Sequence, residues 1–367
     1  MQPIQPRPRR QRLGCVLRRT AILAVVAAAA GLIPLSASAQ TTGIHLSPTG
    51  SDARPCTPAE PCRTTARGQA VANAGQTIWL HAGAYNAEGR STGFGKARIT
   101  WSGVPGEARP RLLGKSVISG TGQRFTRVIF DGPTGNLGSN GYNGNSVLVD
   151  VRGDGVRIDH SEVRDSLGHA GIYVSHGAEW VAIDHNWIHD NGAFGHTAFA
   201  NVDHGIYWSS GWGKVTNNLI EHNYTHGIQL YPSPRAVLVA NNTFVRNGRA
   251  QIMVNSIGPG PFTIANNVIA LGGYNGNQPA LYNYGGHTPP VTYNNLFWQN
   301  SRANTGGGSF TNVNAFVGDP QFTSGYRIGP GSAARDRGMP AYAEPDDFDD
   351  KPRLGVPDIG AFEAGGT

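Results

Sequence analysis

Two His-Gly-Ile segments lie 22 residues apart in the middle of the chain, in "DHGIYWSS" and "THGIQLYP". Their histidines are His204 and His226, and a tyrosine follows each of them, at Tyr207 and Tyr231. Imidazole and phenol side chains can carry protons when their pKa values are tuned. Asp203, directly before the first histidine, adds a carboxylate. These five residues are the candidate catalytic group.

Histidine and tryptophan are concentrated in the same part of the chain. Nine of the 12 histidines lie between residues 160 and 226. Four tryptophans share this window, and aromatic rings stack on the apolar faces of sugar rings. The segment therefore carries the side chains expected of a carbohydrate site. The candidate substrate-binding residues are Arg235, Lys214, Gln229, Trp208 and Trp212.

Several of these residues also have a structural interpretation. A histidine before Gly-Ile can fill a corner and bond a backbone carbonyl, and Asp203 can cap the turn before its strand. Outward tyrosines are common on a solvated sheet. His185 and His189 lie on a different predicted strand, which favours a structural role for both. No recognised ligand spacing predicts a metal site among the histidines, so we expect none.

A repeat of about 25 residues must position these side chains. Six segments share two alternating apolar residues, a polar pair and two more apolar positions. Short strands with this alternation predict a solenoid, in which each strand pairs with its equivalent one turn later. We expect the second residue of each polar pair to adopt the left-handed conformation and to bond its equivalent in the stack. These residues are Ser161, Asn186, Asn218, Asn242, Asn267 and Asn295, at gaps of 25, 32, 24, 25 and 28 residues.

Alternation also sorts the side chains of the second strand in each unit. In "GIQLY", Ile228 and Leu230 are predicted to point inward, and Gln229 and Tyr231 outward. The histidines that precede these strands are expected one coil apart at the rim of the same face. One outward column is predicted to hold no acidic residue and to consist of Tyr173, Tyr207, Gln229, Met253 and Asn283.

On these repeats the chain resembles the right-handed parallel β-helix proteins of the pectate-lyase-like superfamily, over residues 76–317. "GSDARPCTPAEPCRTTARGQAVANAGQTIWLHAGAY" is similar to the opening segment of that family, and "DPQFTSGYRIGPGSAARDRG" with "PDIGAFE" to its closing segment. The resemblance implies an all-β fold, a single-stranded solenoid with a short N-terminal capping helix at 66–74. The predicted divisions are a signal peptide (1–39), an N-terminal segment with the cap (40–75), the β-helix (76–317) and a closing segment (318–367).

The first 39 residues have the pattern of an export signal. Six arginines precede the apolar run "AILAVVAAAAGLIPL", and "SASAQ" supplies a cleavage site of small residues. The run is too short, and too rich in small residues, to predict a membrane anchor. Without this segment the 24 acidic residues are balanced by 24 basic ones, which gives no support for a nucleic-acid partner. We therefore expect a secreted monomer without stable membrane insertion.

The two cysteines outside the signal close a short loop, "CTPAEPC". Cys56 and Cys62 form an even pair in a chain expected to be exported, which predicts a disulfide. Two free thiols are the alternative. The spacing does not fit a zinc knuckle.

The candidate residues fit β-elimination on a uronate-containing polysaccharide best. One histidine of the pair would take the C5 proton, one of the two tyrosines would protonate the leaving oxygen, and Arg235 or Lys214 would neutralise the carboxylate. Relatives in the superfamily use calcium for this last role. Calcium is therefore the one cofactor considered, although the outward columns lack the carboxylate cluster of a calcium site.

Three alternatives remain open. A glycoside hydrolase needs two carboxyl groups one or two coils apart, and only the His-Gly of the superfamily's polygalacturonase-like signature is matched. A C5-epimerase shares the proton abstraction of a lyase, and the sequence does not separate the two. A non-catalytic, adhesin-like surface protein would bind glycan on the same aromatic face, although binding alone does not require so many histidines. The expected partner is a polysaccharide in each case.

Overall fold

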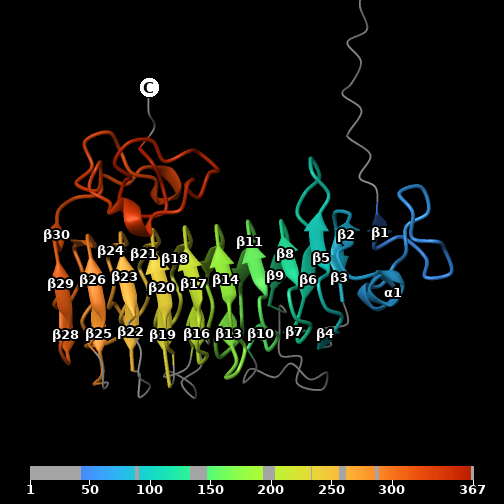
Figure 1. The fold of residues 1–367 in the computed structure, drawn as a ribbon, viewed down its shortest axis with the longest axis horizontal. Helices are drawn as coiled ribbons and strands as arrows, with labels where there is room; N and C mark the ends of the chain where they lie inside the picture. The colour runs from blue at the N-terminus through green and yellow to red at the C-terminus, as the bar shows by residue number, and fades with distance from the viewer. Residues whose placement is uncertain are drawn as a thin grey trace, which may run out of the picture. The chain divides into compact units, whose positions relative to one another are not determined.

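The computed structural model describes residues 43–86, 91–132, 147–192, 203–232, 234–255, 262–285 and 289–364. In these ranges the chain forms three parallel sheets, named A, B and C here, of 11, 10 and 9 strands. Between residues 77 and 307 each coil adds one strand to sheet A, then one to sheet B and one to sheet C, and successive coils stack on one another (Figure 1). The prediction of an all-β, right-handed parallel β-helix is confirmed.

The strands are short and pair in register from coil to coil. Sheet A contains β1 (Ile44–Leu46), β2 (Thr77–Leu80), β5 (Thr100–Gly103), β8 (Arg124–Thr126), β11 (Arg157–Asp159), β14 (Val181–Asp184), β17 (Gly213–Thr216), β20 (Val237–Ala240), β23 (Thr263–Ala265), β26 (Val291–Tyr293) and β29 (Thr311–Val313). Sheet B contains β3 (Ala84–Tyr85), β6 (Arg111–Leu113), β9 (Ile129–Asp131), β12 (Glu162–Arg164), β15 (Trp187–His189), β18 (Leu219–Glu221), β21 (Thr243–Val245), β24 (Val268–Ala270), β27 (Leu296–Trp298) and β30 (Phe316–Val317). Sheet C contains β4 (Thr92–Phe94), β7 (Ser116–Ile118), β10 (Val149–Val151), β13 (Ile172–Val174), β16 (Ile206–Trp208), β19 (Ile228–Leu230), β22 (Ile252–Val254), β25 (Leu281–Asn283) and β28 (Thr305–Gly307).

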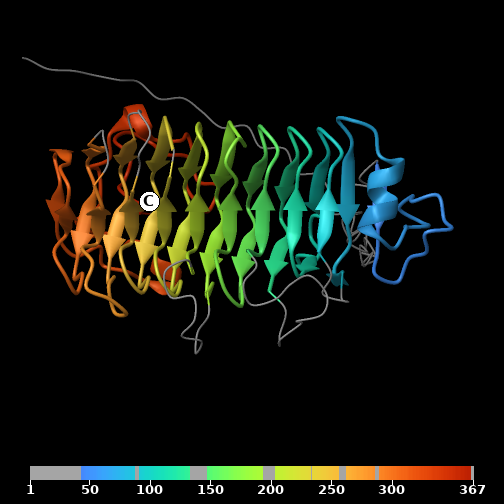
Figure 2. The ribbon, with the colours of Figure 1, turned by 90° about the horizontal axis from the view of Figure 1, so that it is seen from below.

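Apolar side chains from alternate strand positions fill the interior of the coils. Ile206 of β16 and Ile228 of β19, for example, are partners in register, and both are fully buried. Full burial of such a side chain contributes about 1.5–3 kcal/mol. Because one coil cannot enclose its own apolar side chains, stability depends on the stack, whose partner strands lie side by side in Figure 2.

Buried asparagine ladders run along two corners of the stack. Between sheets A and B, Asn186, Asn218 and Asn242 each donate from Nδ2 to Oδ1 of the next ladder member, at 2.9–3.1 Å. This part of the prediction is confirmed. A second ladder, which the repeat did not reveal, lies between sheets B and C. It consists of Asn191, Asn223 and Asn247, joined by bonds of 3.0 and 2.8 Å.

The left-handed backbone conformation was assigned to the wrong member of each polar pair. Positive φ belongs to the residue before each ladder residue, namely His160, His185, Asn217, Asn241, Asn266 and Asn294. The left-handed residue turns the chain, so that the next side chain points into the corner and can bond its equivalent. The turning residue itself lies on the outer side of the corner, where Asn217, Asn241 and Asn266 are buried and bond the C-terminal segment.

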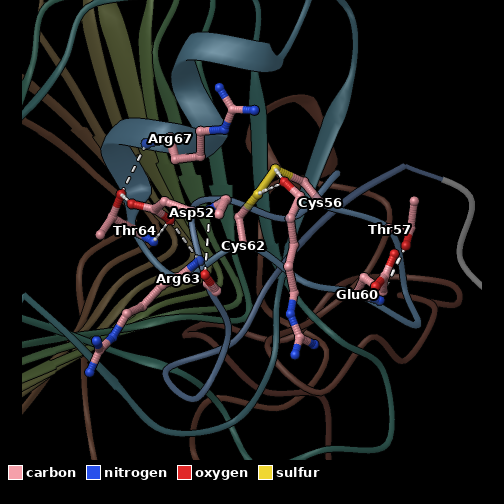
Figure 3. The surroundings of a disulfide bond; sticks show 11 residues. Asp52, Cys56, Thr57, Glu60, Cys62, Arg63, Thr64 and Arg67 are labelled. Carbon is pink, nitrogen blue, oxygen red and sulfur yellow. Dashed lines mark hydrogen bonds between the residues drawn. A yellow bond between two sulfur atoms is a disulfide. The ribbon is translucent and has the colours of Figure 1, made fainter.

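A short helix and a disulfide form the N-terminal end. Helix α1 (Thr65–Val71) begins after Thr64, whose side chain accepts a bond from Arg67 N at 3.1 Å. Cys56 and Cys62 are joined in a disulfide, as predicted, close to Asp52 and the start of α1 (Figure 3). The predicted capping helix is present, and the first strand of sheet A, β1, precedes it in the chain.

The C-terminal segment folds back over the corner between sheets A and B. Its described part contains two 3₁₀ helices, η1 (Ser324–Tyr326) and η2 (Pro340–Tyr342), after the last strand. Turning residues of the corner bond its backbone: Asn217 Nδ2 donates to Asp346 O at 3.0 Å, and Asn294 Nδ2 to Arg337 O at 2.7 Å. Outward polar groups of this corner therefore dock the C-terminal segment, across 129 residues at Asn217 and 43 at Asn294.

No helix within the described ranges is long and apolar enough to cross a bilayer. The predicted export signal, residues 1–39, lies outside the described residues. The predicted domain boundaries stay predictions.

Candidate functional site

The two histidines of the His-Gly-Ile segments are adjacent, as the repeat predicted, but they are enclosed. His204 and His226 lie at the corner between sheets B and C, with ring centroids 5.0 Å apart, and they are 0% and 2% exposed. His204 Nδ1 lies 2.6 Å from Thr225 Oγ1, which itself donates to Asp203 O. His226 Nδ1 donates to Ala250 O at 3.3 Å.

Burial sets the charge of this pair. It lowers the pKa of His226 to about 3 and that of His204 well below its usual value. Both imidazoles are therefore neutral at pH 7, and neither reaches the outer face. The expected position at the rim of the outer face is wrong, because both rings are buried at the corner; their assignment as the proton-abstracting group stays a prediction.

Asp203 has the structural role that was its alternative interpretation. It is fully buried, and its Oδ1 accepts a bond from His169 N at 2.6 Å, across one coil. A carboxylate placed in this way caps the neighbouring turn. It does not face the tyrosines of sheet C as a catalytic acid.

The tyrosine column of sheet C does face outward. Tyr173 and Tyr207 are partners in register, both are half-buried, and their rings stack at 5.3 Å. Burial, followed by the neighbouring Tyr173 and Tyr231, raises the pKa of Tyr207 to about 12. A phenol with a raised pKa keeps its proton and can donate it. Gln229 follows in the same column, 9% exposed, and Tyr231 lies half-buried after β19.

The outward column differs from the predicted one at both ends. Met253 pairs with Tyr282 and not with Asn283, whose side chain is buried and donates to Ser309 O. The column also extends one coil back to Asp150, the partner of Tyr173. The column therefore contains one acidic residue, contrary to the prediction.

Asp150 gathers two cations and a hydroxyl beside the tyrosines. Arg152 Nη2 donates to its Oδ2 at 2.6 Å, Lys115 Nζ lies 3.4 Å from the same oxygen, and Ser175 Oγ donates to Oδ1 at 2.9 Å. Burial alone would raise the pKa of Asp150, but these bonds lower it. Extending the outward column one repeat toward the N-terminus would have found this group, which sequence reasoning missed.

An exposed pair of tryptophans lies at the turn between sheets C and A. Trp180 and Trp212 stack with centroids 5.3 Å apart, and they remain 63% and 38% exposed. The side chain of Arg235, on the next coil, is 52% exposed, and its Nη2 lies 3.9 Å from Glu179 Oε1. Trp212 and Arg235 were predicted site residues, whereas Trp180 was not singled out.

Two other predicted binding residues lie elsewhere. Trp208 is fully buried in the core, where its Nε1 donates to Ser210 O, so it cannot contact a substrate on the outer face. Lys214 lies on β17 of sheet A, where its Nζ donates to Glu344 of the C-terminal segment at 2.6 Å. Lys214 therefore lies on another face than the tyrosines of sheet C, and its assignment as the neutraliser of a uronate carboxylate stays a prediction.

Metal-ligating side chains do not converge on the sheet C face within the described ranges. The group that could hold an ion among the described residues lies at the corner between sheets A and B, and comprises His160, His185 and Asp350. Its position separates it from the tyrosine and tryptophan surface.

Comparisons with known proteins bear on the fold. A family model described as periplasmic copper-binding protein (NosD) matches residues 139–314, slightly under half of the chain. Among solved structures, the pectate lyase Pel9A has a TM-score of 0.59 at 13% identity, and the match covers 88% of this chain and 97% of that one. A rhamnogalacturonan lyase has a TM-score of 0.50 at 12% identity, covering 70% and 73%. No curated protein matches the sequence.

Identities this low show the fold alone. The chain is a right-handed parallel β-helix protein, the architecture to which its repeats pointed. A pectate lyase and a rhamnogalacturonan lyase are among its structural neighbours.

Proposed function

We propose that this protein binds a uronate-containing polysaccharide along the turn between sheets C and A and the adjoining outer face of sheet C. The observation that carries the proposal is the exposed, stacked Trp180–Trp212 pair. Two large aromatic side chains exposed side by side on adjacent coils form an apolar patch, and such patches mark ligand-binding surfaces. Indole rings pack against the apolar faces of sugars.

The charges around the tryptophans favour an acidic glycan. The side chains of Arg235 and Arg152 are 52% and 54% exposed, and guanidinium groups bind carboxylates in a bidentate geometry. Tyr173 and Tyr207 extend the aromatic surface across sheet C. Both guanidinium groups have carboxylate partners, Asp150 and Glu179, but they remain exposed enough to bond a glycan carboxylate as well.

The proposed setting is outside the cytoplasm, with the protein acting as a monomer. The disulfide supports an oxidising compartment, and the family model that matches residues 139–314 is described as periplasmic.

The binding proposal is tested with Trp180→Ala/Trp212→Ala and polygalacturonate as the probe. Isothermal titration should show that the double variant binds about tenfold or more weakly, because both stacking surfaces are lost. Tyr274→Ala is the matched control, since Tyr274 is 51% exposed but lies away from these residues, on His222. Parent protein that fails to bind any uronate polymer, or a double variant that binds as the parent does, contradicts the proposal.

A second candidate, β-elimination at the same surface, is favoured by the group around Asp150. Arg152 would neutralise the uronate carboxylate, Lys115 in its neutral amine form would take the C5 proton, and Tyr207 would protonate the leaving oxygen. The C5 proton passes to the base, the C4–O bond breaks, and its electrons leave with the oxygen as the C4–C5 double bond forms.

Elimination creates an unsaturated uronyl group, whose ultraviolet absorbance is the readout. A panel of uronate polysaccharides should give a rising signal that Arg152→Ala or Lys115→Ala abolishes and that His204→Ala leaves in place per folded molecule. Binding without any absorbance change across the panel would reject the lyase and retain the binding proposal.

A further inference from the structure

Two identical Asp-His pairs occupy equivalent positions on adjacent coils. Asp159 and Asp184 end β11 and β14 and are partners in register, and His160 and His185 directly follow them. Both histidines have the positive φ of the turning residue, 48° and 56°. Their rings stack with centroids 4.7 Å apart and planes only 9° from parallel. The stack thus aligns two imidazoles at the corner between sheets A and B.

A carboxylate orients each imidazole. His160 Nδ1 lies 3.0 Å from Asp159 Oδ1, and His185 Nδ1 lies 2.5 Å from Asp184 Oδ1. Both aspartates are buried and paired with arginines, Asp159 with Arg124, so they are ionised and can only accept. The proton of each ring is therefore held at Nδ1, and Nε2 is left to bind something else. This carboxylate–imidazole arrangement is the usual support of a metal-ligating histidine.

The Nε2 atoms face the Asp-rich part of the C-terminal segment. His160 Nε2 lies 2.7 Å from Asp350 Oδ1, and His185 Nε2 lies 3.6 Å from Asp346 Oδ1. An imidazole with Nδ1 already donating needs a second proton, or a bound cation, between Nε2 and a carboxylate. The two contacts between an Nε2 atom and a carboxylate lie side by side, so a single cation could be bound by both imidazoles.

The amide of Asn217 indicates which form His185 takes. Asn217 Oδ1 accepts from Arg353 Nη2 at 2.8 Å, and its Nδ2 donates to Asp346 O at 3.0 Å, which fixes the orientation of the amide. The NH₂ group is then the part that lies 3.4 Å from His185 Nε2. A donor beside Nε2 points to a lone pair on this nitrogen, which is the atom a metal ion would bind.

The distances between the candidate ligand atoms allow them to coordinate one ion after a small movement. The ligand atoms of His160, His185 and Asp350 all lie within 4.8 Å of one another. Tetrahedral coordination at ~2.1 Å separates ligand atoms by about 3.4 Å. The Asp350 side chain is 61% exposed, so it can move by the difference. A cleft of about 470 Å³, whose lining includes His160 and Asp350, gives an ion access and room for a water as fourth ligand.

We propose that His160 Nε2, His185 Nε2 and the Asp350 carboxylate bind one late first-row divalent transition-metal ion, Zn²⁺ or Cu²⁺. Two imidazole nitrogens and one carboxylate suit these ions, whereas Ca²⁺ and Mg²⁺ select oxygen ligands. The ion would fasten the C-terminal segment to the corner of the β-helix. This site lies apart from the tryptophan surface and does not depend on the proposed glycan function.

The test uses untagged full-length protein stripped with a chelator and titrated separately with Zn²⁺, Cu²⁺ and Ca²⁺ in a calorimeter. Zn²⁺ or Cu²⁺ should bind at one equivalent and raise Tm, and Ca²⁺ should do neither. His160→Ala/His185→Ala should weaken binding about 100-fold or more. His176→Ala is the matched control and should bind as the parent does, because His176 is exposed on another turn. The larger response of the two binding ions identifies the preferred metal.

A second variant and a spectroscopic readout keep the test decisive if the double variant does not fold. Asp350→Asn retains the shape of an exposed side chain and should weaken binding about tenfold. Co²⁺ bound to the parent should give visible d–d absorption, which Asp350→Asn shifts. The proposal is overturned if the parent binds no Zn²⁺ or Cu²⁺ stoichiometrically, or if neither variant changes the affinity. Those results would leave a protonated His160 bonding Asp350 as the contact at this corner.

Discussion

The two histidine pairs of this protein are built alike and differ in chemistry. His204 and His226 have ring centroids 5.0 Å apart, and His160 and His185 have theirs 4.7 Å apart, each pair joining adjacent coils. The first pair bonds a hydroxyl and a carbonyl inside a closed corner, where burial lowers both pKa values. The second bonds carboxylates, and there His160 is part-exposed whereas His185 is buried. Stacking of equivalent positions brings side chains together, but the environment of the corner decides what they can do.

The largest expected effect is on stability and concerns the asparagine ladder between sheets A and B, at the corner that carries His160 and His185. Asn218→Ala should destabilise the fold by about 3–5 kcal/mol, because it removes partners from Ile183 O, Thr216 O and Asn186 N inside the corner. Urea unfolding followed by circular dichroism measures the loss. Asn294→Ala is the control, since Asn294 turns the same corner at a less buried place, and it should cost under about 1 kcal/mol. Equal costs would mean that the ladder does not hold the corner.

The next effect tests whether the enclosed pair is structural. His204→Ala should cost about 2–4 kcal/mol, because it leaves a cavity in a fully buried corner. Polysaccharide binding by the folded fraction should stay within twofold of the parent, as measured by titration at a temperature where both are folded. If His204→Ala is as stable as the parent but loses binding or turnover, His204 belongs to the active group and the enclosed pair is not merely structural.

The repeat made much of this architecture predictable. Period-two alternation, the spacing of the polar pairs and the two cysteines are local signals, and they gave the solenoid, one asparagine ladder and the Cys56–Cys62 disulfide. The proximity of His204 and His226 followed from the same repeat.

The remaining features depend on information that spacing does not carry. A slip of one residue in β25 exchanged Tyr282 for Asn283 in the outward column, because "LYNYG" alternates acceptably in either register. Burial of His204 depends on how the corner closes, and the position of Lys214 on a covered face depends on Glu344, 130 residues later. The contact between His160 and Asp350 spans 190 residues, so no local pattern could reveal the candidate metal site.

A smaller effect on stability is expected at the His160–His185 pair in metal-free protein. His160→Ala should cost about 1 kcal/mol, because its partner Asp350 is largely exposed and such pairs are screened by solvent. The loss should be local, so that limited proteolysis cuts the C-terminal segment faster while the β-helix core stays resistant. His176→Ala should cleave at the parent rate. An unchanged cleavage rate in His160→Ala would show that this pair does not dock the segment.

The smallest effect is on the pH dependence of stability. The free energy of unfolding should change with pH in opposite directions for an enclosed histidine and for a carboxylate-bound one. The pKa of His226 is about 3 when folded and about 6.5 when unfolded, so between pH 7 and 6 the unfolded chain binds more protons and acidification destabilises the fold. The shift is about 0.7 kcal/mol over that unit. His189 behaves oppositely: burial lowers its pKa, but bonds to Asp190 and Glu162 outweigh this and raise the pKa to about 9. Its stabilisation is complete below the unfolded pKa and is lost as pH rises through about 9.

Two variants therefore tilt the stability profile in opposite directions. In the parent, acidification from pH 7 to 6 lowers the free energy of unfolding through His226 and raises it through His189, each by about 0.7 kcal/mol. His226→Gln should remove the first contribution, and His189→Gln should remove the second. Urea midpoints at both pH values, measured with a chelator present, give the slopes, and exposed His176→Gln should leave the slope unchanged. Slopes of the same sign would mean that His226 is hydrated or paired in solution, and the contrast between closed and carboxylate-bound corners would fail.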